Sequence, residues 1–352
     1  MGDGGERSGG LGLAEEALAV VLLFGVVSLL GDMSYEGFRS ALPVLVRGGL
    51  ELGGVVGLGE VLAWSLRPAT GLLADRLGAY WGFTGLGYAL IPVGVLAASQ
   101  GGVLLVLGYG LERLGKALRS PSRDALLGGL AGGRRGLVFG LHEAMDQVGA
   151  VAGPLLAYAA LARGAGLWLL AVPAAFTLPV LAAAWRLYPR SAVPGPRRSL
   201  RESLGGGLRA SLYVAAVGTL VAGPLAVEYV ARVLGGVPRG SAPLLYAVAM
   251  LSDALAAVPL GVLYDRSPGA AALLPALFGV AAGATVLAVG GSPAGALAAA
   301  ALSGVAEAGF ETVARAMVRG GAGGYGLYGL ARGASAAGSI ALYSWLAGLV
   351  AG

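Results

Sequence analysis

Three charged residues in the first long apolar stretch are spaced so that they can act together. Asp32, Glu36 and Arg39 follow at intervals of four and three residues, so two carboxylates and one guanidinium share a helix face. A charge at the centre of a bilayer costs about 2.5–3.5 kcal/mol on insertion scales, so each one needs a partner or a function. We predict that Asp32 and Glu36 bind a proton or a cation, with Tyr35 beside them. A buried structural ion-pair network is the alternative.

A second cluster of ionisable residues lies in the fifth apolar stretch. His142 and Asp146 are one helical turn apart, and Glu143 is also within a turn of Asp146. A neighbouring carboxylate can move the protonation of an imidazole across the physiological range, and of two close carboxylates one keeps its proton more readily. We predict a second proton site here, and neutralisation of arginines on the preceding span is the alternative. One histidine with carboxylates is not a specific metal site, and we expect no metal or cofactor.

Most other charges in the apolar stretches are predicted to form structural pairs. Arg113 cannot lose its proton, so we expect it to pair with Asp32 or Glu143. Glu112 and Lys116 have the spacing and order of a favourable helical ion pair. In the second half of the chain the same interpretation applies to Glu307, Glu311 and Arg315 on one helix face, and to Arg332, which could pair with Glu307 or Glu228.

The composition shows what surrounds these charges. Of the 352 residues 57% are hydrophobic and 12% charged, whereas a soluble domain has about 25% charged residues, and the mean hydropathy is +0.78. These values exclude a soluble enzyme, a nucleic-acid-binding protein and a disordered chain, and they leave a polytopic membrane protein. The chain has no cysteine and one histidine, which excludes disulfides, thiolate chemistry and multi-histidine metal sites.

Apolar stretches of about 20 residues, the length that crosses a bilayer, recur eleven times along the chain. The ten-residue alternation of a membrane β-barrel is missing, so we predict an all-α polytopic membrane protein. The predicted spans are 17–47, 53–74, 80–99, 102–119, 137–161, 164–186, 208–231, 241–263, 269–290, 293–314 and 325–350.

Arginine-rich connections predict the orientation in the membrane. The two longest loops, 119–136 and 187–208, hold four arginines each and fall on one side if the spans alternate. By the positive-inside rule this side is the cytoplasm, and the N-terminus lies there too. Residues 1–16 form a predicted tail with no evident signal peptide.

Two similar segments indicate an internal repeat. Asp75-Arg76 and Asp265-Arg266 end matching apolar stretches 190 residues apart, and Gly140 and Gly149 recur as Gly329 and Gly338 at an offset of 189. Parallel repeats around a central cavity are a transporter architecture. We predict a six-helix bundle over 17–186, a cytoplasmic linker over 187–207 and a bundle of about five helices over 208–352.

The segment Gly71 to Gly78, with Asp75 and Arg76, resembles motif A of the major facilitator superfamily of secondary transporters, and the segment ending at Asp265-Arg266 lies where that family repeats it. The resemblance extends over essentially the whole chain. It implies that Asp75 holds the two halves together at a cytoplasmic gate. Ala79 and Tyr80 stand where the family usually has basic residues, so we expect a reduced latch.

The fifth span resembles the family's antiporter motif through Gly140, Gly149 and Gly153-Pro154. Its glycines allow close helix contact and its proline bends the helix. This motif is typical of exporters that exchange drugs or metabolites for protons, and Arg113 resembles the arginine on their fourth span. The family norm is twelve spans, so with eleven we expect the last helix to be missing, which would leave one flank of the second bundle uncovered.

Together these features predict a proton-coupled secondary transporter in a prokaryotic cell membrane. We expect a monomeric efflux antiporter for a small amphipathic or cationic molecule, with no nucleic-acid partner. An uptake permease for a sugar or organic ion is the main alternative. An intramembrane enzyme is less favoured, because cysteine is absent and His142 has no serine within a turn of its helix. A channel is a further alternative.

Overall fold

The computed structural model describes residues 15–45, 49–196, 199–237 and 242–351, and within these ranges every regular element is a helix. The first half contains α1 (Glu15–Leu45), α2 (Gly49–Ser65), α3 (Arg67–Leu77), α4 (Tyr80–Ala98), α5 (Gly102–Leu130), α6 (Arg135–Ala162), η1 (Leu167–Leu170) and α7 (Ala171–Leu187). The predicted tail lies outside the described residues except for Glu15 and Glu16, which begin α1.

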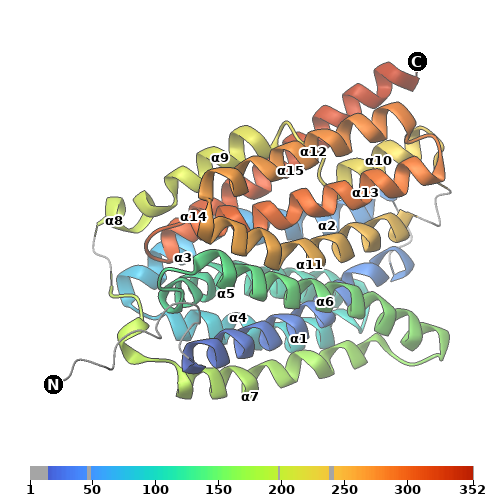
Figure 1. Cartoon of the computed structure of the whole chain (residues 1–352). Helices are drawn as coiled ribbons and strands as arrows, with labels where there is room; N and C mark the ends of the chain where they lie inside the picture. The colour runs from blue at the N-terminus through green and yellow to red at the C-terminus, as the bar shows by residue number, and fades with distance from the viewer. Residues whose placement is uncertain (1–14, 46–48, 197–198, 238–241, 352) are drawn as a thin grey trace.

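Short elements, η2 (Arg190–Ala192), α8 (Leu200–Leu204) and η3 (Gly205–Gly207), follow α7. The second half contains α9 (Leu208–Gly218), α10 (Pro224–Val233), α11 (Ala242–Arg266), α12 (Pro268–Val289), α13 (Pro293–Ala308), the π-helical segment η5 (Gly309–Ala314), α14 (Arg315–Met317) and α15 (Ala322–Ala351). The long helices run roughly side by side, with α1, α4 and α7 in the lower part of Figure 1 and α9, α12 and α15 in the upper part.

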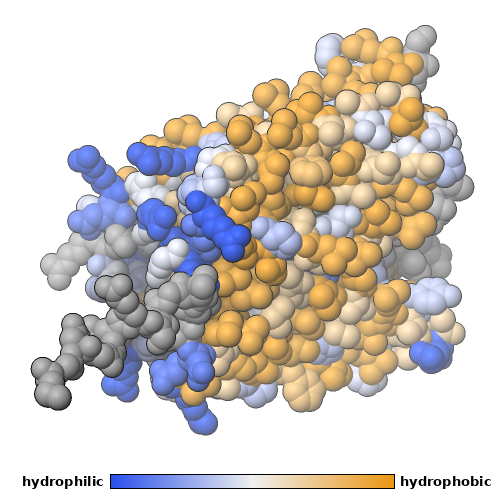
Figure 2. Space-filling view, in the orientation of Figure 1, coloured by the Kyte–Doolittle hydropathy of each residue, from blue (hydrophilic) through white to orange (hydrophobic). Residues whose placement is uncertain are grey.

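Eight of the described helical stretches are long and apolar enough to cross a membrane by length and composition alone. The other three predicted spans correspond to helices that are interrupted or strongly charged. Proline begins a new helix at α3 and at α10, which divides two of the spans. The third, α5, is 29 residues long but carries six charges from Glu112 to Asp124. A broad hydrophobic belt covers the molecule, with hydrophilic side chains gathered at one end (Figure 2). The all-α polytopic prediction is therefore confirmed.

The prediction of a loop over residues 119–136 is wrong. Helix α5 continues to Leu130 and α6 begins at Arg135, so the connection is only residues 131–134. Arg119 and Arg123 are 2% and 8% exposed, because Glu112 and Asp124 provide acidic partners inside the bundle. Arg119 and Arg123 are therefore not loop residues. The arginines that still support the predicted orientation are Arg134 in the connection and the exposed Arg190 and Arg201.

The two halves meet closely at the end of the molecule where α1 begins and α8 lies, on the left in Figure 1. We call this the closed end. Gly136 of α6 and Gly261 of α11 touch so closely that a Cβ on either would collide with the other's carbonyl, and a Cβ on Gly71 of α3 would collide with Ala322 of α15. Glycine is required at these contacts because only its missing side chain allows the backbones to meet. The contact between α6 and α11 and the contact between α3 and α15 are alike, because in each a helix of the first half packs its backbone against a helix of the second half.

Candidate functional site

A cavity of about 350 Å³ lies between the two halves. Helices α1, α2, α3, α5 and α6 line it from the first half, and α9, α10, α11, α13, η5, α14 and α15 line it from the second. Its walls carry eight acidic and seven basic residues, so they do not present a single sign of charge. The acids are Asp32, Glu36, Glu60, Asp124, Glu143, Asp146, Glu307 and Glu311, and the bases are Arg39, Arg67, Lys116, Arg119, Arg123, Arg315 and Arg332.

The predicted group on α1 faces this cavity as its helical spacing requires. Arg39 donates to the Tyr35 hydroxyl at 3.1 Å, and its guanidinium lies 3.7 Å from Glu36 and 3.5 Å from Glu60 of α2. Asp32 lines the cavity but forms no hydrogen bond or ion pair within the described part of the chain. Of the α1 carboxylates, Asp32 is therefore the one free to take a ligand or a proton.

The prediction that Arg113 pairs with Asp32 or Glu143 is wrong. Arg113 is fully buried behind the cavity wall, its Nε donates to Glu112 at 2.5 Å, and Glu60 lies 3.4 Å from its Nη1. Its guanidinium carbon lies 3.5 Å from the centre of the Tyr35 ring. Stacking on an aromatic face suits the planar guanidinium and keeps it away from the cavity.

The expected pair between Glu112 and Lys116 is absent, because Glu112 is taken by Arg113 and Arg119. Lys116, the only lysine of the chain, lines the cavity instead. Its Nζ lies 4.4 Å from the centre of the Tyr35 ring, and it forms no ion pair with any described residue. It is thus a compact positive charge that a ligand can approach.

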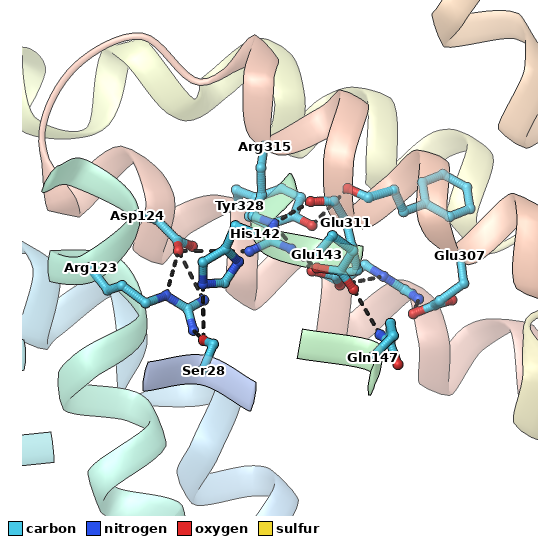
Figure 3. A network of polar contacts seen from close by, with 12 residues as sticks. Ser28, Arg123, Asp124, His142, Glu143, Gln147, Glu307, Glu311, Arg315 and Tyr328 are labelled. Atoms are coloured by element: carbon cyan, nitrogen blue, oxygen red, sulfur yellow. Dashed lines mark hydrogen bonds and ion pairs between the residues drawn. The ribbon is translucent and has the colours of Figure 1, made fainter. Parts of the chain in front are cut away.

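Arg315 of α14 is the centre of an ion-pair network that joins the halves. It contacts Glu143 of α6, and its guanidinium lies 3.7 Å from Asp124 of α5 and 3.5 Å from Glu311 of η5. Gln147 donates to Glu143 at 2.7 Å. Figure 3 shows these side chains converging from the helices of both halves. Since Arg315 belongs to one half and Glu143 and Asp124 to the other, relative movement of the halves must alter these pairs.

A second arginine extends this network along α15. Arg332 contacts Glu307, which confirms the predicted pair, and its Nε also lies 3.4 Å from Glu311. The π-helical turn of η5 holds Glu311 between Arg315 and Arg332. Such turns frequently occur at functional sites.

The predicted cluster on α6 divides between two environments. Glu143 and Asp146 line the cavity, whereas His142 is fully buried and faces Ser28 at 2.9 Å from Nε2. Arg123 donates to the same serine hydroxyl at 2.8 Å. The described structure shows no contact between His142 and Asp146, so the histidine belongs to a packed polar cluster.

The two motif aspartates hold the closed end. Asp75 is fully buried and accepts hydrogen bonds from the backbone N–H groups of Ala322 and Gly323 at 2.7 and 2.9 Å, where α15 begins. Asp265 accepts from Gly136 and Leu137 at 2.7 and 2.9 Å, where α6 begins. A carboxylate is favourable at a helix N-terminus because it satisfies free N–H groups and interacts with the helix dipole. Each aspartate therefore fastens its own half to a helix of the other.

The flanking motif residues complete this lock. Tyr80, which stands where a basic residue was expected, donates to Asp75 at 2.9 Å, and Ser203 of α8 contacts the same carboxylate. Arg76 and Arg266 are exposed and form no ion pair among the described residues. Gly78 ends α3 with a φ of +62°, a conformation that favours glycine. The expectation of a reduced latch is wrong at Asp75, because Tyr80 and Ser203 supply donors.

The glycine motif of α6 lets this helix pack tightly on both sides. A Cβ on Gly149 or Gly153 would collide with the carbonyl of Leu29 or Met33 on α1. A Cβ on Gly140 would crowd Ala257 on α11. Pro154 lies inside the helix. Helix α6 thus belongs to the first half and is also the helix along which the second half packs.

Several cavity residues were predicted from the sequence only as members of structural pairs, and Asp124 was not predicted at all. The residues predicted as pairs are Glu60, Lys116, Glu311, Arg315 and Arg332. The sequence feature that could have identified these residues as cavity-lining was a charge inside an apolar span. Lys116 was also the sole lysine of the chain. Spacing along one helix does not show which residues of other helices lie nearby. Among the described residues, no group of three or more His, Cys, Asp and Glu is placed to hold a metal ion.

Comparisons with known proteins give both close and distant similarities. No protein-family model matches the chain. It is 34% identical to the uncharacterized protein Rv2265 of Mycobacterium tuberculosis over 378 aligned residues, which cover 97% of this chain and 89% of that protein. It is 33% identical to the uncharacterized MFS-type transporter MJ1317 of Methanocaldococcus jannaschii over 142 residues, or 39% of this chain and 36% of the other.

Two solved structures have the same fold. The human organic anion transporter MFSD10 (TETRAN) matches with a TM-score of 0.70 at 16% identity, covering 95% of this chain and 97% of that one. A bacterial homologue of the iron transporter ferroportin, in its outward-facing state, matches with a TM-score of 0.71 at 17% identity and covers 96% of each chain. At these identities the likeness concerns the fold alone.

Proposed function

The chain belongs to one family with the mycobacterial protein Rv2265 and shares its fold with two solved transporters, and from that premise we propose that it is a transporter of the major facilitator superfamily, a proton-coupled secondary transporter that exports a small organic ion. The observation that carries the proposal is the charged cavity between two halves that are locked together at one end. Rocking of the halves would open the closed end and expose the cavity to the other side of the membrane.

Exchange with protons is supported by the acids along the cavity. Asp32 has no partner among the described residues, and one oxygen of Asp146 has none either. A proton or a substrate cation can therefore neutralise these carboxylates without first breaking an ion pair. The glycine motif of α6 resembles in sequence the antiporter motif of proton-coupled exporters, which favours export over uptake. We assign the closed end to the cytoplasm, where Arg190 and Arg201 are exposed nearby.

The substrate we propose is organic and carries a negative group. MFSD10 is described as an organic anion transporter and the ferroportin homologue as similar to an iron transporter. The described residues offer no cluster suited to a metal ion, whereas Lys116 offers a free ammonium. A carboxylate, sulfonate or phosphate on the substrate would complete its pairing.

The transport test compares wild type with Asp32→Asn in proteoliposomes under an imposed pH gradient, using a panel of organic anions, cations and zwitterions. We expect wild type to move at least one of them against its gradient when protons flow the other way. Asp32→Asn should lower this proton-driven accumulation about tenfold, the size of a typical coupling between two ligands. The matched control, Glu202→Gln, changes an exposed acid outside the cavity and should transport normally. Movement of substrate and protons in the same direction would contradict export and favour the uptake permease.

The charge of Lys116 should decide which substrates bind. Lys116→Gln removes the free ammonium and should weaken binding of the anionic panel members about tenfold, because one charge-assisted hydrogen bond contributes about 1.5–3 kcal/mol. Cationic members should bind at least as well as before. Competition binding to purified protein measures both, with Lys116→Arg as the control that keeps the charge. Equal losses of affinity for anions and cations would show that Lys116 does not discriminate between substrates by their charge.

A further inference from the structure

Asp253 is a buried carboxyl group that the proposed cavity does not use. It lies within α11, is 0% exposed, and neither of its oxygens has a hydrogen-bond partner among the described residues. An ionised carboxylate in such a position is among the most unfavourable arrangements in a protein, because it loses its hydration and gains no partner. The neutral acid pays a much smaller penalty, so this environment favours a carboxyl group that carries a proton.

The position of Asp253 links it to the cavity. Tyr246 and Met250 line the cavity from α11, and Asp253 follows them at helical intervals of four and three residues on the same face. Asp253 therefore lies one turn deeper than the cavity lining, on the way to the closed end. The same helix reaches the lock at Asp265.

The charges that act on Asp253 come from helices packed against α11. They are Glu143 on α6, Glu307 on α13, Glu311 on η5 and Arg315 on α14. Of the other neighbouring helices, α12 has no ionisable side chain, and α10 contributes Glu228 and Arg232, which pair with each other. Three acids and one base therefore act electrostatically on a fourth acid, and Arg315 is already paired with Glu143 and Glu311.

We propose that Asp253 carries a transported proton in this conformation and releases it when the halves move apart at the closed end. The Glu143–Arg315 pair crosses between the halves, so opening of the closed end would separate it. Arg315 would then keep Glu311 of its own half but lose Glu143, which leaves more of its charge to stabilise an ionised Asp253. The O–H bond of the Asp253 carboxyl breaks, the proton passes to water that enters from the opened end, and the carboxylate keeps the electron pair. The proposal rests on the proposed transport function and adds the residue that would connect proton release with rocking.

Infrared spectroscopy of the purified full chain in lipid discs tests the resting protonation without any substrate. At neutral pH wild type should show the C=O band of a protonated carboxylic acid that Asp253→Asn lacks. Glu202→Gln, in which an exposed acid of α8 outside the cavity is replaced, should keep the band. Asp253→Leu provides a second variant without the carboxyl group if Asp253→Asn does not fold. An unchanged band in either folded Asp253 variant would overturn the proposal, whatever the transport assays give.

Transport in proteoliposomes tests the link to movement. Asp253→Asn imitates the neutral acid, so exchange of substrate between equal internal and external pools should stay within about twofold of wild type, while accumulation driven by a pH gradient should fall about tenfold or more. Full proton-driven accumulation in Asp253→Asn would overturn the proposal. If wild type itself shows no proton-driven transport, the proposed function fails, while the infrared result still reports on Asp253.

Discussion

Replacing Asp75 with alanine is expected to open the closed end and to lower transport by about two orders of magnitude. The variant loses the acceptor for two backbone N–H groups of α15, for Tyr80 and for Ser203. Hydrogen bonds to a charged group contribute about 1.5–3 kcal/mol each. A net loss of about 3 kcal/mol from the closed-end state would change its population relative to the open one about a hundredfold.

The natural absence of cysteine makes this change measurable. A single cysteine in place of Leu260, which is 5% exposed on α11, should react slowly with a membrane-impermeant thiol reagent in the otherwise unchanged protein. In the Asp75→Ala background the same cysteine should react much faster. Asp265→Ala is the matched variant from the other half and should act in the same direction. Equal labelling rates with and without Asp75 would show that the lock does not hold the closed end.

Removing Arg315 is expected to give the largest loss of stability. Arg315→Met leaves Glu143, Asp124 and Glu311 near one another without their shared cation. Breaking a buried ion pair by removing one partner costs about 3–5 kcal/mol, because the remaining charge stays buried and uncompensated. Thermal unfolding of the purified protein should report this loss as a lower midpoint.

Two further variants test whether the loss of stability comes from breaking this network or from the removal of any arginine. Adding Glu143→Gln to Arg315→Met should restore part of the stability, since it removes one of the stranded acids, and contacting residues show interaction energies of about 0.5–3 kcal/mol. Arg232→Met removes a side chain that is 42% exposed in its pair with Glu228, and such pairs contribute about 0–1 kcal/mol. Similar midpoints for Arg315→Met and Arg232→Met would contradict the central role of Arg315.

The helices could be predicted from the sequence because membrane spans require long apolar runs, and the two motif aspartates could be located from the repeat. The face shared by Asp32, Glu36 and Arg39 could also be predicted, since spacing along one helix determines it. The end of α5 could not be predicted from the sequence. The arginines from 119 onward suggested an aqueous loop, yet partners on the helix itself and on α1 keep Arg119 and Arg123 in the bundle.

Partners between helices were the least predictable feature. Arg113 was expected to meet Asp32 or Glu143, but the adjacent Glu112 and the Tyr35 ring satisfy it first. Arg332 was expected to meet Glu307 or Glu228, both in its own half, and the structure shows Glu307 as its partner. The role of Arg315 as a bridge to Glu143 depends on how the halves are docked. Spacing within a helix does not contain that information.

The way in which Asp75 and Asp265 are held has a consequence for the study of relatives. Both are bound by main-chain amides at the first turns of α15 and α6, and every residue type except proline provides such an amide. The residues that supply these amides need no polar side chain for the contact, although Gly136 must remain glycine because of its contact with Gly261. Searches for correlated substitutions should find little covariation across these junctions, although they join the two domains.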